Sequence, residues 1–64
     1  MYHVAIVRRQ GKNTEYRTSD KVRIHSNYVE LSLGKKTQYI ELSGVIEIVE
    51  SEITDEGEPG EILT

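Results

Sequence analysis

The side chains of this 64-residue chain that could take part in chemistry are few in kind. There is no cysteine, so a nucleophile would have to be a serine or threonine with a histidine as its base. The two histidines, His3 and His25, fall at alternating positions of predicted strands, and no carboxylate stands at a spacing that would orient either ring. A chain this short also offers little room for a closed pocket of about 300 Å³ or more. The sequence therefore predicts no catalytic residue, and we expect a protein that is not an enzyme.

Metal and cofactor sites are equally unsupported. Asp55, Glu56 and Glu58 lack the spacing of a calcium loop, and the histidines lack the spacing of a zinc site. The five glycines are isolated, and none stands between a predicted strand and a helix, as a phosphate-binding loop requires. We expect no bound metal and no cofactor.

The charges are divided between the two halves of the chain, although the net charge is only −3. Residues 1–36 hold all eight Lys and Arg against three acids, which gives +5, and residues 37–64 hold eight acids and no cation, which gives −8. Such asymmetry can indicate a nucleic-acid surface or an acidic interaction segment, although simple solvated charge is the commoner explanation. A nucleic-acid site would use the basic residues of two predicted hairpins with a tyrosine ring beside them: Arg8, Arg9, Lys12, Arg17, Lys35, Lys36 and Tyr39.

The elements that must position these residues are strands. Apolar and polar residues alternate over most of the first 49 positions, which is typical of strands with one buried face. The predicted strands cover residues 2–8, 14–18, 21–25, 28–33, 38–42 and 45–49. The core would consist of β-branched aliphatic residues and tyrosine, which favour sheets. The spacing predicts one all-β domain, either a small antiparallel meander or an SH3-like barrel of five or six short strands.

The two clearest strands and the one after them have a predictable register. We place two-residue turns at residues 26–27 and 35–36. The first turn puts Arg23 opposite Glu30, and the second puts Glu30 opposite Glu41. A turn one residue later than the first would shift the pairs by two and leave the faces unchanged. The polar face of these strands would then neutralise most of its own charge, which favours a structural role over a binding site.

The last predicted strand carries apolar side chains on both of its faces: Val45, Ile46, Ile48 and Val49. One face should pack on the core, and the other is then left over for a partner, unless the strand is buried on both sides. We predict these four residues as the partner-binding surface. Because a chain of 64 residues can form only a small core, association into a homodimer is a further way to bury apolar surface.

From Ser51 the composition changes to acidic residues, two glycines and the only proline. We expect a small β domain at residues 1–50 and a flexible acidic tail at residues 51–64. No apolar run approaches the roughly 20 residues that span a membrane, and the N-terminus does not resemble a signal peptide, so we expect a cytoplasmic protein with no membrane partner.

The function that we favour is a non-enzymatic binding module for another protein. Its size, charge and lack of catalytic residues would suit a small regulator or inhibitor of the kind that phages and mobile elements encode. The alternative is a nucleic-acid-binding β barrel that uses the basic N-terminal half, with the acidic tail as an autoinhibitor.

Overall fold

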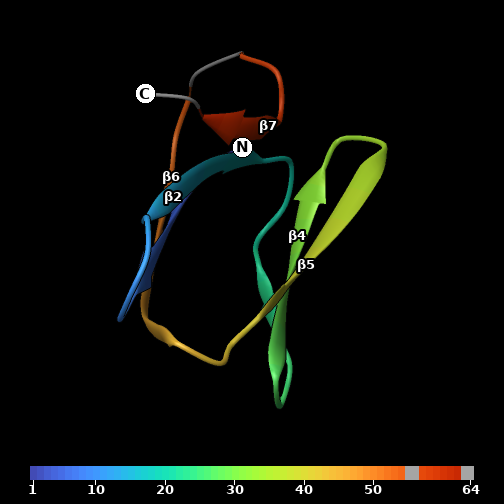
Figure 1. The fold of residues 1–64 in the computed structure, drawn as a ribbon. Helices are drawn as coiled ribbons and strands as arrows, with labels where there is room; N and C mark the ends of the chain where they lie inside the picture. Colours follow the sequence, from blue (N-terminus) through green and yellow to red (C-terminus); the bar gives the residue numbers. More distant parts are fainter. Residues whose placement is uncertain (55–56, 63–64) are drawn as a thin grey trace.

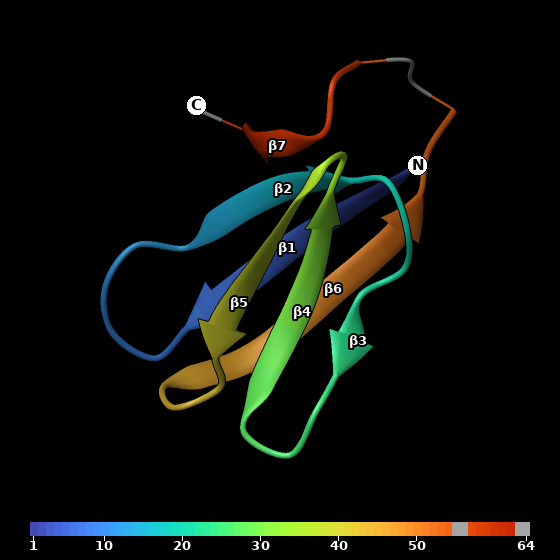
Figure 2. The same ribbon diagram turned by 90° about the vertical axis from the view of Figure 1, so that its right-hand side faces the viewer.

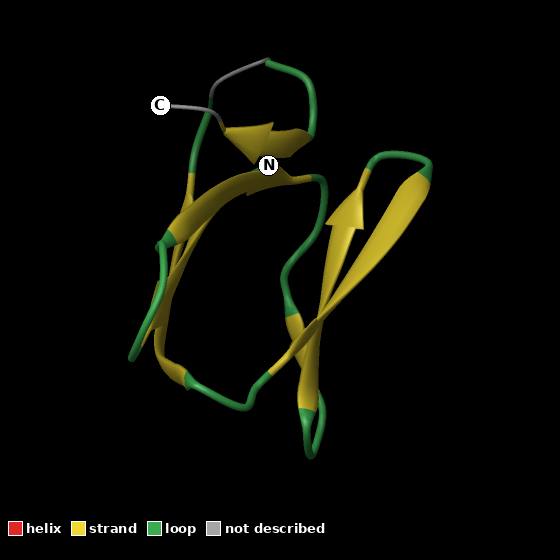
Figure 3. Cartoon of the chain, viewed as in Figure 1, coloured by secondary structure: helices red, strands yellow, loops and turns green. Residues whose placement is uncertain are grey.

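A computed structural model of the chain describes residues 1–54 and 57–62, which form strands and no helix (Figures 1 and 3). In chain order the strands are β1 (Tyr2–Arg8), β2 (Thr14–Thr18), β3 (Arg23–Ile24), β4 (Tyr28–Leu33), β5 (Lys36–Glu41), β6 (Val45–Glu52) and β7 (Gly60–Ile62). One sheet has the order β6-β1-β2-β7 and the other has the order β3-β4-β5. All pairs are antiparallel, so the all-β antiparallel prediction is confirmed, but the two sheets do not close into a barrel.

The two sheets face each other (Figure 1), and a small apolar core lies between them. Its buried apolar side chains come from β1, β2, β4 and β5: Val4, Ile6, Tyr16, Val29, Leu31 and Ile40. They occupy every second position of their strands, because successive side chains of a strand point to opposite faces. The bounds of β1, β2 and β4 match the prediction, since the alternation in these segments is continuous.

The hairpin between β4 and β5 corrects the predicted register by two residues. Leu33 pairs with Lys36, so the turn consists of Gly34 and Lys35, not of residues 35–36. Gly34 has a φ of 72°, and a two-residue turn with glycine at its first central position is a favoured hairpin connection. Glu30 therefore lies opposite Tyr39, not opposite Glu41. The shift is an even number, so every side chain keeps its predicted face.

The turn at residues 26–27 and the pair of Arg23 with Glu30 are confirmed. The side-chain contact made by Glu30 differs from the prediction, because its Oε1 lies 3.2 Å from Nε2 of His25. Cross-strand contacts thus stabilise the outer face of the three-stranded sheet, as expected. The side-chain partner of Glu30 is His25, however, and not Arg23.

A flexible tail at residues 51–64 is not confirmed. Strand β6 runs across the predicted domain boundary to Glu52, and β7 pairs with β2. The guanidinium of Arg17 lies against Gly57, so that an added Cβ there would force this side chain to shift, and Pro59 lies beside Gly34. The parts of the predicted tail at residues 55–56 and 63–64 lie outside the described residues.

Candidate functional site

An apolar hollow lies between β6, at the edge of the four-stranded sheet, and the residues at the ends of β3 and β5 in the three-stranded sheet. Its volume is about 280 Å³ and its lining consists of Ile24, Leu42, Val45, Ile46, Glu47 and Ile48. We call this hollow the β6 groove. Strands β6 and β3 belong to the two facing sheets (Figures 1 and 2), and the groove is lined from both. Ile24 and Ile46 are 63% and 56% exposed, and exposed apolar side chains that gather in one hollow can mark an interaction site.

A β-bulge explains why three of the four predicted partner-binding residues gather in this groove. Val7 pairs with Glu47 and Arg8 pairs with Val45, so Ile46 has no residue opposite it on β1. A bulge inserts one extra residue and redirects the side chains around it. Strict alternation would separate Val45 from Ile46, whereas in the structure both line the groove with Ile48.

The fourth predicted residue, Val49, does not belong to this site. It lies opposite Ala5 on the outer face of the four-stranded sheet and is 45% exposed. Conversely, Ile24 and Leu42 line the groove but were not predicted as partner-binding residues. Their alternation marked them as apolar face residues, but it did not show that they stand at the open end of a sheet.

The free edge of β6 adds main-chain groups to the site. The N–H of Ile53 donates a hydrogen bond of 2.9 Å to the carbonyl of Met1, so the odd-numbered residues of β6 bond to β1. In an antiparallel ladder the residues between them point their N–H and C=O groups the other way. Ile48, Glu50 and Glu52 thus present these groups at an edge that pairs with no strand among the described residues.

A polar contact ties this edge to the segment that leads into β3. The carboxylate of Glu50 accepts a hydrogen bond of 2.8 Å from the N–H of Val22, just before β3. Because the acceptor is charged, the bond is stronger than a neutral one, although its exposure weakens it. This bond links the two sheets next to the β6 groove.

Replacing Glu50 with alanine should weaken the link between the two sheets. We expect a loss of about 0.5–1 kcal/mol in the free energy of unfolding and a two- to fivefold faster exchange of the Val22 amide with water. Glu52→Ala is the control, because it removes the same charge from the same strand. Amide exchange followed by NMR measures both variants, and an unchanged rate at Val22 in Glu50→Ala would contradict the role of this bond.

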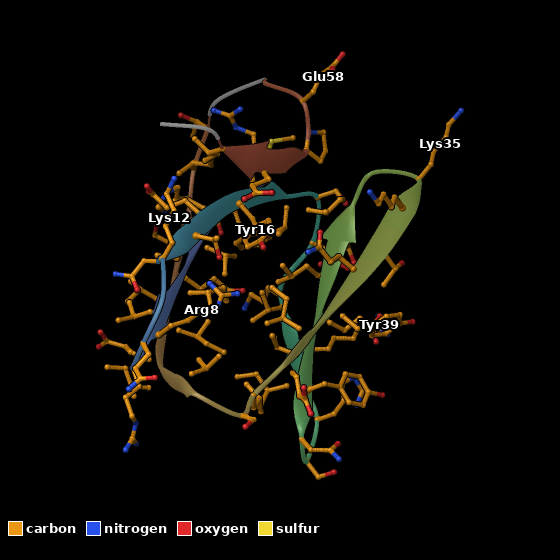
Figure 4. The ribbon with its side chains drawn as sticks, viewed as in Figure 1. Arg8, Lys12, Tyr16, Lys35, Tyr39 and Glu58 are labelled. Carbon is orange, nitrogen blue, oxygen red and sulfur yellow. The ribbon has the colours of Figure 1, made fainter. Side chains whose placement is uncertain are left out.

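The basic residues predicted for nucleic-acid binding lie in separate places. Lys12 belongs to the β1–β2 hairpin and Lys35 to the β4–β5 hairpin, and the two lie on different sides of the molecule (Figures 2 and 4). Arg8 is held locally, because its Nη1 donates to Oγ1 of Thr14 at 2.7 Å and to the carbonyl of Lys12 at 3.1 Å. Arg9 follows Arg8 in the first hairpin, Lys36 begins β5, and Arg17 packs on the C-terminal segment.

The tyrosines form an aromatic face only on the three-stranded sheet. Tyr39 is 61% exposed and points away from the body of the molecule, whereas Tyr16 is buried between the sheets (Figure 4). Tyr28 meets Tyr39 edge to face at 5.5 Å and stacks on His25 at 4.4 Å. Rings in such pairs prefer these geometries, so the contacts stabilise the sheet without a ligand.

Both histidines contact a carboxylate, which corrects the expectation that none is placed to orient them. Nε2 of His3 lies 2.8 Å from Oε1 of Glu15, and His25 contacts Glu30. The two pairs belong to different sheets and lie at partly exposed positions.

Two kinds of feature are missing from the part of the chain that the structure describes. Within residues 1–54 and 57–62, no three His, Asp or Glu side chains gather so that they could hold a metal ion. The same ranges contain no helix that is long and apolar enough to cross a membrane. Comparison with family models, with curated proteins and with solved structures finds no match to this chain.

Proposed function

We propose that this chain is a non-catalytic protein-binding module whose partner occupies the β6 groove. The observation that carries the proposal is the pair of exposed isoleucines, Ile24 and Ile46, in one hollow beside a strand edge with which no described strand pairs. Burying a large aliphatic side chain stabilises a complex by about 1.5–3 kcal/mol when the side chain becomes fully buried. A few such side chains in a hollow are typical anchors of protein interfaces. A small protein with this surface can act as a regulator or inhibitor by occupying part of its target.

Nucleic-acid binding has less support. The basic residues that would make the site come from two hairpins on different sides of the molecule, and Arg8 already bonds within its own hairpin. Binding to single strands needs a continuous basic groove with stacking rings. We therefore expect no binding of DNA or RNA oligonucleotides at low salt, and binding that weakens steeply as salt increases would favour this alternative.

Ile46→Ser tests the proposed function against Val49→Ser. Both variants replace an exposed aliphatic residue of β6 with the same neutral residue, but only Ile46 lines the groove. The partner is first captured from lysate of the source cells, then purified and titrated against the three proteins by calorimetry. We expect Ile46→Ser to weaken binding about tenfold, because truncation of an anchor residue usually costs more than about 1 kcal/mol. Val49→Ser should weaken binding less, by about fivefold at most, because a cross-strand neighbour on the exposed face contributes about 1 kcal/mol or less.

If Val49→Ser weakens binding more than Ile46→Ser does, the interface lies on the outer face of the four-stranded sheet and the β6 groove is not the binding site. Equal affinity of all three proteins would exclude both faces of β6. A capture that returns no partner able to bind the purified chain would refute protein binding itself. Circular dichroism of each variant shows that it is folded before its affinity is compared.

A further inference from the structure

The free edge of β6 combines exposed carboxylates with main-chain groups that bond to no strand of the described part of the chain. Ile48, Glu50 and Glu52 direct their N–H and C=O groups outward, and the side chains of Glu47, Glu50 and Glu52 are exposed. Charged residues on an edge strand discourage pairing with unsuitable strands. The edge is therefore open to main-chain pairing, but only with a strand whose side chains suit these acids.

A second copy of this chain does not suit them. Two β6 strands paired antiparallel over residues 48–52 would place the Glu50 carboxylates of the two copies directly opposite each other. Like charges that face each other across strands destabilise the pair. Nucleic acid is equally unsuitable, because its phosphates would approach the same carboxylates, and residues 37–64 supply no Lys or Arg to receive them.

We propose that the occupant of the β6 groove is an extended segment of a partner protein that adds a strand to β6 and carries basic residues opposite its acids. This inference rests on the proposed function and specifies its ligand. Strand addition to an exposed edge is a common way to bind an extended peptide, with affinity from the main chain and specificity from alternate side chains. The segment runs antiparallel to β6, as do all strand pairs of the described structure.

The sequence of β6 sets the pattern of the segment. Cross-strand neighbours prefer opposite charge or matching apolar character. The segment has basic residues opposite Glu52, Glu50 and Glu47, and apolar residues opposite Val49 and Ile48. From its N-terminus it therefore contains a basic residue, any residue, a basic residue, two apolar residues and a basic residue.

The second apolar residue of the segment is its anchor. Ile48 lies opposite Ile6 of β1 and lines the groove. A partner side chain that pairs with Ile48 from the free edge of β6 therefore extends this row of apolar side chains by one strand. That row leads toward the exposed Ile24 and Ile46. The carboxylate of Glu50 then has a basic neighbour on one side in addition to the N–H of Val22.

Synthetic peptides test this pattern directly. The probe is a capped peptide with the order Lys-Thr-Lys-Val-Val-Lys, and its two controls are the same peptide with glutamate in place of lysine and a permuted peptide of the same composition. Each is titrated into isotope-labelled protein. We expect the probe to bind about tenfold more tightly than either control, and to slow the amide exchange of Ile48, Glu50 and Glu52. In the double variant Glu47→Lys with Glu52→Lys, the glutamate peptide should bind more tightly than the probe.

Several results would overturn the inference. These are equal affinity of the probe and the permuted peptide, no slowed exchange at the edge amides at millimolar peptide, or shifts confined to the hairpins. A dimer that forms without peptide and protects the same amides would identify a second copy as the occupant. If the partner is sensitive to Ile46→Ser while the peptides show no preference, the proposed function stands and only the strand-addition inference is wrong. If the probe behaves as expected but the partner ignores Ile46→Ser, the edge binds peptides and the proposed function is wrong.

Discussion

Ile6→Ala should leave the protein largely unfolded at 37 °C. The Ile6 side chain is fully buried, lies opposite Ile48 on β6 and opposite Thr14 on β2, and belongs to the single core cluster of the described residues. Truncation of a buried isoleucine to alanine costs about 2–5 kcal/mol, since it removes apolar contacts and leaves a cavity. A domain of this size rarely derives more than about 3–5 kcal/mol from its core. The loss therefore equals most of the stability that the fold has.

Ile46→Ala is the matched control, because it makes the same chemical change on an exposed side chain. We expect a change of about 0.5 kcal/mol or less in the free energy of unfolding, as is usual for surface positions. Urea denaturation followed by circular dichroism measures both variants. Similar losses in the two would mean that Ile46 is packed as tightly as Ile6, which would contradict an open groove.

The parts of the fold that could be predicted are those in which side-chain alternation alone determines the structure. Val29 and Leu31 alternate with polar residues on β4, and both are buried as that pattern requires. The same reasoning predicted the bounds of β1 and β2. It was wrong about the β4–β5 turn because it centred the turn on residues 35–36, although Gly34, with a φ of 72°, is the first of the two central residues.

The candidate site could be predicted only in part, because it depends on features that alternation does not encode. The bulge at Ile46 changes which side chains share a face, and no residue type marks it in the sequence. The contact of His3 with Glu15 is diagonal, since Glu15 pairs with Ala5, so it needs the register of β1 and β2. Ile24 became part of the groove through the way the two sheets come together, which is a property of the tertiary structure.

Strand β7 could not be predicted for a different reason. Its residues, Gly60–Ile62, have no apolar pattern, and their acidic surroundings are typical of a flexible segment. Main-chain pairing with β2 does not require such a pattern, because the edge of a sheet offers N–H and C=O groups to any chain that can reach them. The contribution of this pairing to stability therefore depends on main-chain hydrogen bonds, and a proline substitution tests it because proline has no N–H to donate.

Ile62→Pro should destabilise the protein by about 2 kcal/mol, whereas Glu61→Pro should have little effect. The even-numbered residues of β1 bond to β2, so Glu15 and Arg17 direct their main-chain groups toward β7, where they pair with Ile62 and Gly60. Proline at residue 62 removes the N–H that donates to Glu15. Glu61 turns its N–H away from β2, so proline there restricts the chain equally without removing a bond of the ladder.

Amide exchange at Arg17 and urea denaturation measure the difference between these two variants. The Arg17 amide faces Gly60 across the β2–β7 pair, so it should exchange faster in Ile62→Pro and at the parental rate in Glu61→Pro. If both variants match the parent, residues 60–62 do not form a stable strand and the flexible tail is the better description. If both are destabilised alike, the restriction of the chain by proline, and not the lost hydrogen bond, determines the effect.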